Sequence, residues 1–252
     1  MFNPLDLKGR RYLITGAASG IGKACAIYLS KLGADLLLVD INKEQLEFTN
    51  SSENLKASIL EIDLTNVDAL KEKITNEVED NRKLNGFVHC AGVPYIAPLK
   101  TISSERVKKV LDINTIAGLE LAKLFINRKI YAGDHGSIVF ISSVYGLVGS
   151  VANVGYALSK GAVHSITKAL AIELAPKNIR VNCIAPGFIK TEMSDLINHN
   201  FDSNYDKHIE SLHPLGLGKT DDIAAGVAFL FSDMSTWMTG SIISIDGGFT
   251  AQ

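Results

Sequence analysis

The chain is organised around the stretch Arg10-Arg11-Tyr12-Leu13-Ile14-Thr15-Gly16-Ala17-Ala18-Ser19-Gly20-Ile21-Gly22. A short apolar run leads into a loop with three glycines, and a helical pattern follows from Lys23 to Leu32. A strand, a glycine loop and a helix in this order aim the N–H groups of a helix N-terminus at a phosphate. The spacing Gly-x-x-x-Gly-x-Gly differs from the Gly-x-Gly-x-x-Gly fingerprint, so the loop taken alone is also compatible with a plain tight turn.

Strand-like runs alternate with helix-length patterns along the chain. The expected strands are Tyr12–Ile14, Asp35–Val39, Ala57–Ile62, Phe87–Cys90, Ser137–Ile141, Arg180–Ile184 and Ser241–Ile245. The expected helices are Lys23–Leu32, Asn42–Asn50, Asn66–Val78, Ser104–Leu111, Ile113–Tyr131, Val154–Leu174 and Asp221–Leu230. This alternation predicts an α/β fold, a doubly wound parallel seven-stranded sheet flanked by helices (Rossmann fold). No linker-like stretch divides the chain, so residues 1–252 are expected to form a single domain.

The composition excludes several classes of function. Hydrophobic residues make up 46% of the chain and charged residues 21%, which supports a large core and argues against disorder. A formal charge of -2 gives no reason to expect nucleic acid or an anionic membrane as a partner. No secretory signal pattern and no apolar run of membrane-spanning length is visible, so a cytoplasmic protein is expected. The separated cysteines Cys25, Cys90 and Cys183 indicate buried thiols, and no metal site is expected.

Ligands of such sheets bind outside the carboxyl ends of the strands. Those ends carry Gly16–Gly22, Asp40, Asp63, Ala91-Gly92, Ser142-Ser143 and Pro186-Gly187. A carboxylate at Asp40 can accept hydrogen bonds from both hydroxyls of an adenosine ribose and would repel a ribose 2'-phosphate. We therefore expect NAD as the cofactor rather than NADP. The alternative, that Asp40 is an ordinary polar residue at a strand end, stays open.

Tyr156 and Lys160 stand four residues apart on the longest expected helix, so their side chains share one face. A phenol ordinarily loses its proton at a pKa of about 10. A neighbouring ammonium favours the phenolate, so we expect Lys160 to lower that pKa and Tyr156 to act as a general acid and base. Ser143, at the end of the fifth strand, is expected to hold a substrate carbonyl oxygen. Without further context, a tyrosine and a lysine four residues apart are more often a plain surface pair, and the surrounding motifs reverse that balance here.

These motifs together resemble the short-chain dehydrogenase/reductase family in its classical form, over essentially the whole chain. Thr15 to Gly22 is similar to the cofactor motif of that family, and Cys90-Ala91-Gly92 to the motif at the end of its fourth strand. Asp246-Gly247-Gly248 is similar to its C-terminal signature. The resemblance implies the catalytic residues Asn114, Ser143, Tyr156 and Lys160, with Asn114 linking Lys160 to a proton relay through backbone and water contacts.

The resemblance also implies the residues that bind cofactor and substrate. For the cofactor they are Gly16, Ser19, Gly20, Ile21, Gly22, Asp40, Asp63, Leu64, Ala91, Gly92, Tyr156, Lys160, Pro186, Gly187, Ile189 and Thr191. For the substrate they are Ser143, Tyr145, Val93, Tyr95 and Phe188, with a substrate-covering segment at about residues 188–215. One departure is plain, because His89-Cys90 stands where the family often has two asparagines. We expect both residues to be structural.

The predicted function is NAD(H)-dependent interconversion of a secondary alcohol, polyol, sugar or hydroxyacyl compound and its ketone. One alternative is a 3-oxoacyl-carrier-protein reductase, which the chain resembles in the Pro214-Leu215-Gly216 stretch and at Lys177. Asp40 and Asp134 speak against it, since those enzymes usually prefer NADPH and carry an arginine near Asp134. A second alternative, from a different class, is a non-catalytic dinucleotide-binding regulator. The resemblance further implies a homotetramer or homodimer.

Overall fold

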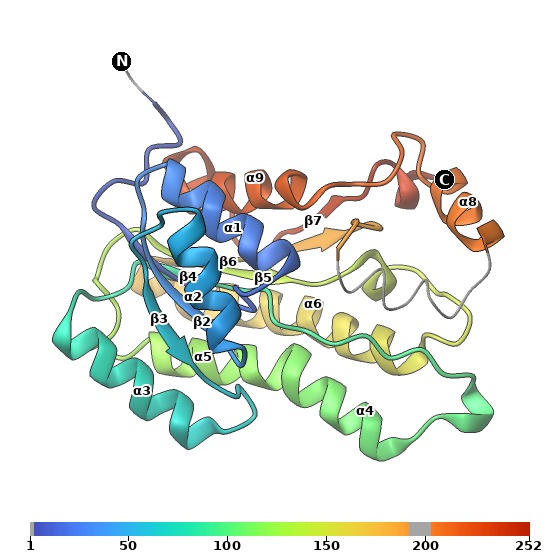
Figure 1. The fold of residues 1–252 in the computed structure, drawn as a ribbon, viewed down its shortest axis with the longest axis horizontal. Coiled ribbons are helices and arrows are strands. Elements are labelled where there is room, and N and C mark those ends of the chain that lie inside the picture. Colours follow the sequence, from blue (N-terminus) through green and yellow to red (C-terminus); the bar gives the residue numbers. More distant parts are fainter. Residues whose placement is uncertain (1–2, 192–202) are drawn as a thin grey trace.

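One parallel sheet in the order β3-β2-β1-β4-β5-β6-β7 forms the centre of the fold (Figure 1). The computed structural model describes residues 3–191 and 203–252. The strands are β1 Arg11–Thr15, β2 Asp35–Asp40, β3 Ser58–Glu61, β4 Gly86–His89, β5 Gly136–Ile141, β6 Ile179–Pro186 and β7 Ile242–Ile245. The α-helices are α1 Gly20–Lys31, α2 Lys43–Ser52, α3 Val67–Asp80, α4 Ser104–Leu111, α5 Ala117–Phe125, α6 Val154–Leu174, α8 Ser203–Ser211 and α9 Thr220–Phe231. The predicted single α/β domain with a seven-stranded sheet is confirmed.

Both faces of the sheet are covered, which explains why its central strands lack polar alternation. Successive side chains of a strand point to opposite faces, so Leu36 and Leu38 of β2 join one core while Leu37 joins the other. The first core lies under α1, α2 and α9, and the second under α3, α5 and α6 (Figure 1).

The strand order reverses at the centre of the sheet, where β1 pairs with both β2 and β4. In the β1–β4 pair, Thr15 lies opposite His89 at the carboxyl ends of the two strands. Connections leave these ends in opposite directions, so a crevice opens between them. The glycine loop after β1 and the residues after β4 therefore face each other.

The helix expected over Ile113–Tyr131 is the clearest difference from the sequence prediction. The structure has one π-helical turn at Asp112–Ile116 between α4 and α5, and α5 ends at Phe125. A π turn is a single-turn change of hydrogen bonding within a helical segment, too short for a coarse reading of the apolar pattern to reveal it. The helix α8 was not predicted either, because its nine-residue sequence is short and mostly polar. Among the described residues, no helix is long and apolar enough to cross a membrane.

Candidate active site

Two adjoining cavities open at the carboxyl ends of the strands. The larger has a volume of about 590 Å³ and contains Tyr156 and Lys160 in its lining. The smaller, of about 330 Å³, is lined by the glycine loop and Asp40. Ile21, Cys90, Gly92 and Thr191 line both cavities. The sequence-predicted residues thus lie along one continuous site at the strand-order reversal.

The glycine loop packs too closely against its neighbours to carry side chains. Gly16 has a φ of +65°, and a Cβ built on it would lie 2.8 Å from the Cα of Ala91. A Cβ on Gly22 would overlap the carbonyl oxygen of Gly16. The side chain of Ser19 does not cap α1, and the first turn of that helix holds no acidic residue. A helix N-terminus presented in this way suits the phosphates of a dinucleotide.

The far end of the smaller cavity carries two carboxylates. The Asp40 oxygens accept hydrogen bonds from the N–H groups of Ala18 and Asn42, each at 3.1 Å. Asp63 accepts from both the hydroxyl and the N–H of Thr65, and these bonds lower the pKa of its carboxyl. Among the described residues, no lysine or arginine lines this cavity. This end of the smaller cavity is therefore acidic.

His89 ties the ends of β1 and β4 to the π turn. Its Nδ1 lies 2.9 Å from the Thr15 hydroxyl, and its Nε2 lies 3.1 Å from the carbonyl of Ile113. The Thr15 hydroxyl in turn accepts a bond from the Ala91 N–H. Burial first, and the charge of Lys160 second, lower the pKa of His89 to about 4 despite the bond to Ile113. A neutral ring satisfies this network when Nε2 donates and Nδ1 accepts, so His89 is structural as expected.

His89 also makes stability depend on pH. Between pH 6.5 and about 4 the unfolded chain binds a proton at His89 that the folded chain does not, so stability falls as the pH falls. The shift corresponds to at most about 3 kcal/mol. We expect the unfolding free energy of the wild type, measured with urea, to drop more steeply across this window than that of His89→Asn. Equal drops in both proteins would show that His89 does not titrate in this range.

Asn114 sits fully buried within the π turn and braces the loop after β4. Its amide accepts from the N–H of Val93 at 2.8 Å and donates to the Val93 carbonyl at 3.1 Å. It also donates to the hydroxyl of Ser159 at 3.0 Å. Its side-chain bonds thus go to Val93 and Ser159 rather than to Lys160. The expected relay through backbone and water stays a prediction.

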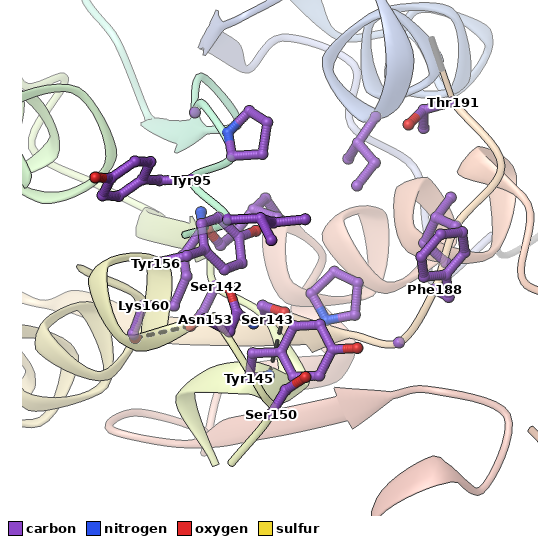
Figure 2. A pocket seen from close by; sticks show the side chains of 18 of the residues that line it. Tyr95, Ser142, Ser143, Tyr145, Ser150, Asn153, Tyr156, Lys160, Phe188 and Thr191 are labelled. Carbon is purple, nitrogen blue, oxygen red and sulfur yellow. Dashed lines mark hydrogen bonds between the residues drawn. The ribbon is translucent and has the colours of Figure 1, made fainter. Parts of the chain in front are cut away.

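Lys160 is buried on α6 and reaches the end of β5. Its Nζ donates to the carbonyl of Ile141 at 3.0 Å, and its own carbonyl accepts from the Ser142 hydroxyl at 2.9 Å (Figure 2). Burial lowers the pKa of Lys160 to about 8. A buried ammonium at this point places a positive charge where the two cavities meet.

Tyr156 projects into the larger cavity from the turn of α6 before Lys160 (Figure 2). Burial raises its pKa to about 12, and a hydrogen bond with the Ser143 hydroxyl only partly offsets that effect. The expected net lowering of this pKa is wrong for this structure, because burial is the largest effect on the phenol. The Lys160 Nζ lies over the ring, 5.6 Å from its centre, and burial outweighs that contact. The resting tyrosine is therefore a protonated hydrogen-bond donor.

Most of the expected substrate residues line the larger cavity, namely Ser143, Tyr145, Tyr95 and Phe188, together with Pro186, Gly187, Ile189 and Thr191 (Figure 2). Val93 differs, because it lines the smaller cavity, where its backbone is held by Asn114. Leu64 and Ala91 also line the smaller cavity, as expected of cofactor residues. Within the expected covering segment at 188–215, residues 192–202 lie outside the described part of the chain.

The loop at Val93 to Leu99, expected to contact substrate, contributes Ile96 and Pro98 to the lining, but sequence reasoning missed the wall formed by Ser150 to Asn153. These residues belong to loops without a recognisable motif, so only their position in space reveals them. His213, in the expected covering segment, fixes the backbone of Phe188, because the Phe188 N–H donates a hydrogen bond to Nε2 of His213 at 3.1 Å. The C-terminal signature also contributes, since Asp246 packs against Gly187 and accepts from the N–H of Gly248.

The three cysteines are free thiols, as expected. Cys25 is fully buried, and a hydrogen bond with Cys90 together with burial raises the pKa of its thiol. Burial raises the pKa of Cys183 to about 12. High pKa values make these two thiols poor nucleophiles. Within residues 3–191 and 203–252, no cluster of three or more potential metal ligands occurs.

Comparison with known proteins adds to this geometry. A family model described as Enoyl-(Acyl carrier protein) reductase matches residues 16–250. The chain is 36% identical to the 3-oxoacyl-[acyl-carrier-protein] reductase FabG of Thermotoga maritima, over 97% of this chain and 99% of that protein. It is 32% identical to the 2,5-dichloro-2,5-cyclohexadiene-1,4-diol dehydrogenase of Sphingobium indicum, over 98% of this chain and 99% of that protein.

Solved structures agree. A short-chain type dehydrogenase/reductase from Mycobacterium marinum has a TM-score of 0.90 at 29% identity, covering 99% of this chain and 98% of its own. A protein from Agrobacterium tumefaciens described as a 2-deoxy-D-gluconate 3-dehydrogenase, with bound NADP, has a TM-score of 0.89 at 31% identity and covers both chains fully. The chain belongs to the classical short-chain dehydrogenase/reductase family, whose members are oxidoreductases acting on alcohols and ketones with a nicotinamide dinucleotide.

Proposed function

We propose that this protein interconverts a secondary alcohol and its ketone with NAD(H), using Tyr156 as the proton donor and acceptor. The observation that carries the proposal is the arrangement around the phenol. Tyr156 and Ser143 line the same cavity, which adjoins the glycine loop, and the buried Lys160 Nζ lies 5.6 Å from the centre of the Tyr156 ring. A proton-transfer group, an oxygen-holding group and a cation therefore meet where substrate and dinucleotide would meet.

The residues of the chain act on the oxygen of the substrate. Ser143 donates a hydrogen bond that holds a carbonyl oxygen beside the phenol, and Tyr156 gives that oxygen its proton as the ketone is reduced. In the reverse direction Tyr156 accepts the alcohol proton. Lys160 stabilises the phenolate left behind, since positive charge next to a developing anion lowers the barrier to forming it. Asn114 fixes the loop at Val93 and thereby the shape of the site.

The site fits a dinucleotide. Gly16 and Gly22 allow the loop to pack tightly at the start of α1, and Asp40 and Asp63 would hold the adenosine end. Gly92 leaves room for the Asn114 amide, because a Cβ there would lie only 3.2 Å from its Oδ1. Pro186, Gly187 and Thr191 would hold the nicotinamide end. When bound, the cofactor supplies the acceptor or donor of the hydride, which no amino-acid side chain provides.

The proposed preference for NAD rests on Asp40. Its carboxylate would repel a ribose 2'-phosphate, and no described cation lines the smaller cavity to offset this. We expect kcat/KM with NAD to exceed that with NADP by about 100-fold, equivalent to about 3 kcal/mol. In Asp40→Ala, kcat/KM with NAD should exceed kcat/KM with NADP by no more than about tenfold, chiefly because the value with NADP rises. The Agrobacterium tumefaciens relative is described with bound NADP, so a protein of this fold can take NADP, and equal use of both cofactors by the wild type would refute this role of Asp40.

A 3-oxoacyl-carrier-protein reductase is the second candidate, favoured by the Thermotoga maritima relative. The apolar lining of the larger cavity by Tyr95, Ile96 and Pro98 would suit an acyl chain. Against it, Asp134 is exposed where an arginine would dock an acidic carrier, and it is paired with Asn85 at 3.0 Å. The two candidate functions are distinguished by comparing kcat/KM for a 3-oxoacyl group attached to carrier protein with kcat/KM for the same acyl group attached to a small thiol. The second candidate requires a strong preference for the carrier-bound form.

The expected homotetramer or homodimer remains a prediction. Large apolar side chains are exposed on this chain at Trp237, Ile172 and Met234, and burial of such groups drives association. Light scattering of the purified protein at micromolar concentration should show a dimer or larger species. A monomer there would contradict the expectation.

A further inference from the structure

Asn153 stands at the N-cap of α6 but does not cap the helix. Asparagine is among the best N-cap residues, since its side-chain oxygen accepts from the N–H groups of the first turn. Asn42 and Asn66 do so in this chain, accepting from Gln45 at 3.0 Å and from Ala69 at 3.1 Å. The side chain of Asn153 accepts no such bond. Its amide therefore has another orientation than a capping role requires.

The Asn153 amide instead belongs to the larger cavity. The residue is only 6% exposed, and it lines that cavity together with Ser143 and Tyr156 (Figure 2). Within the described part of the chain, no side chain or backbone group forms a hydrogen bond with its amide. The Asn153 amide atoms are not among the fully enclosed unpartnered side-chain atoms of the described residues, so they are open to the cavity. A ligand in this cavity can therefore form hydrogen bonds with the amide.

The backbone before Asn153 is held in an unfavourable conformation. Ala152 has a φ of +59°, in the left-handed region that costs a residue with a Cβ about 1–2 kcal/mol. Its carbonyl accepts from the N–H of Ala97 at 2.8 Å, which joins this turn to the loop carrying Tyr95 and Ile96. Strain of this kind persists where the surrounding structure imposes it, and it is concentrated at ligand sites. Here it fixes the direction in which the next residue leaves the turn.

The other groups around Asn153 restrict what it can bind. An amide both donates and accepts, so it recognises a hydroxyl or a carbonyl. Lys160 is the one charged side chain among the described residues of this lining, and most of the rest is apolar. No described carboxylate lines this cavity, so a cationic substituent would find no partner there, and Lys160 is the single described cation that an anionic substituent could reach. The chemistry of this wall therefore suits an uncharged oxygen on an otherwise apolar molecule.

We propose that Asn153 binds a second, uncharged oxygen of the substrate, close to the carbon that is oxidised or reduced. The substrate is then a diol, a hydroxyketone or a 3-hydroxyacyl compound rather than an alcohol with a single oxygen. This inference rests on the proposed function, because it concerns selectivity within the same site. Asn153 is a specificity-determining residue, and Tyr156 and Ser143 still act on the reacting oxygen.

The test compares matched substrates that differ in the second oxygen. One pair is cyclohexanol and the vicinal cyclohexanediol, and the other is secondary butanol and the methyl ester of 3-hydroxybutyrate. We expect the wild type to prefer the second member of a pair. Asn153→Leu should lower kcat/KM for that member by about 10- to 100-fold, as expected for a lost hydrogen bond, and change the first by less than about threefold. Asn153→Ala, which adds no bulk, should show the same selectivity.

Asn66→Leu is the matched control, because Asn66 caps α3 outside both cavities. Asn66→Leu should lower the melting temperature and leave kcat/KM for both members of each pair unchanged. Asn153→Leu, in contrast, should leave the melting temperature nearly unchanged. If the Asn153 variants lowered kcat/KM equally for both members of a pair, or for neither, the assignment of Asn153 would be wrong and the oxidoreductase proposal would stand. If the wild type turned over no member of either pair with NAD or NADP, the proposed function itself would fail.

Discussion

Replacing Tyr156 by phenylalanine should lower kcat by about 1,000-fold, within the range that general acid–base groups contribute. The substitution removes only the hydroxyl, which is the proton donor in the proposed mechanism and lines the cavity together with Ser143. The ring, its packing and the Lys160 Nζ above it remain. Binding of NADH, followed by fluorescence titration, should therefore change by less than about threefold.

Tyr145→Phe is the matched control for that result. Tyr145 lines the same cavity, and its hydroxyl is hydrogen-bonded with Ser150 rather than with Ser143. Its loss should change kcat by no more than a few-fold, because no proton passes through it in the proposed mechanism. Residual activity of Tyr156→Phe above about a tenth of the wild type would assign the proton transfer to another group.

Gly22→Ala should weaken dinucleotide binding by about 100-fold or more. The added methyl group would overlap the Gly16 carbonyl, so the start of α1 must move away from the loop that faces the phosphates. Losing two charge-assisted hydrogen bonds to a phosphate costs about 3 kcal/mol, which is about 100-fold in Kd. Overpacking of this kind should also lower the stability by about 1–3 kcal/mol. Calorimetric titration with NADH and a thermal melt measure the two effects.

Gly161→Ala provides the control for the Gly22 variant. Gly161 lies within α6, and a Cβ there would approach nothing closer than the Gly146 oxygen at 3.9 Å. Alanine is favoured over glycine in a helix by about 1 kcal/mol, so this variant should bind NADH normally and melt slightly higher. Tight binding of NADH by Gly22→Ala would mean that the dinucleotide does not lie against the glycine loop.

Much of the fold follows from local sequence signals. Unbroken apolar runs marked β2 and β5, because strands covered on both faces need no polar alternation. The predicted bounds of α6, Val154–Leu174, coincide with the structure. The π turn at Asp112–Ile116 escaped prediction because the apolar pattern continues through it. It buries Asn114 facing the loop at Val93, an orientation that spacing alone does not reveal.

The site was predictable where a motif names the residue and unpredictable where burial decides its chemistry. Gly16, Gly22, Tyr156 and Lys160 could be identified from spacing, and the structure places them along one site. The pKa of Tyr156 could not be predicted from the sequence, because burial raises it whereas the nearby Lys160 was expected to lower it. Asn153 was also invisible, because an asparagine before a helix normally indicates a cap.

The most direct test of the central claim is the absorbance of reduced nicotinamide when the purified protein meets NAD and a panel of secondary alcohols. The panel contains simple alcohols, diols, polyols, hydroxysteroids and 3-hydroxyacyl thioesters. The proposed function requires that at least one alcohol produces NADH continuously with wild-type protein and not with Tyr156→Phe. Saturable binding of NAD without turnover of any alcohol, and without reduction of the matching ketones by NADH, would identify a non-catalytic dinucleotide-binding protein instead.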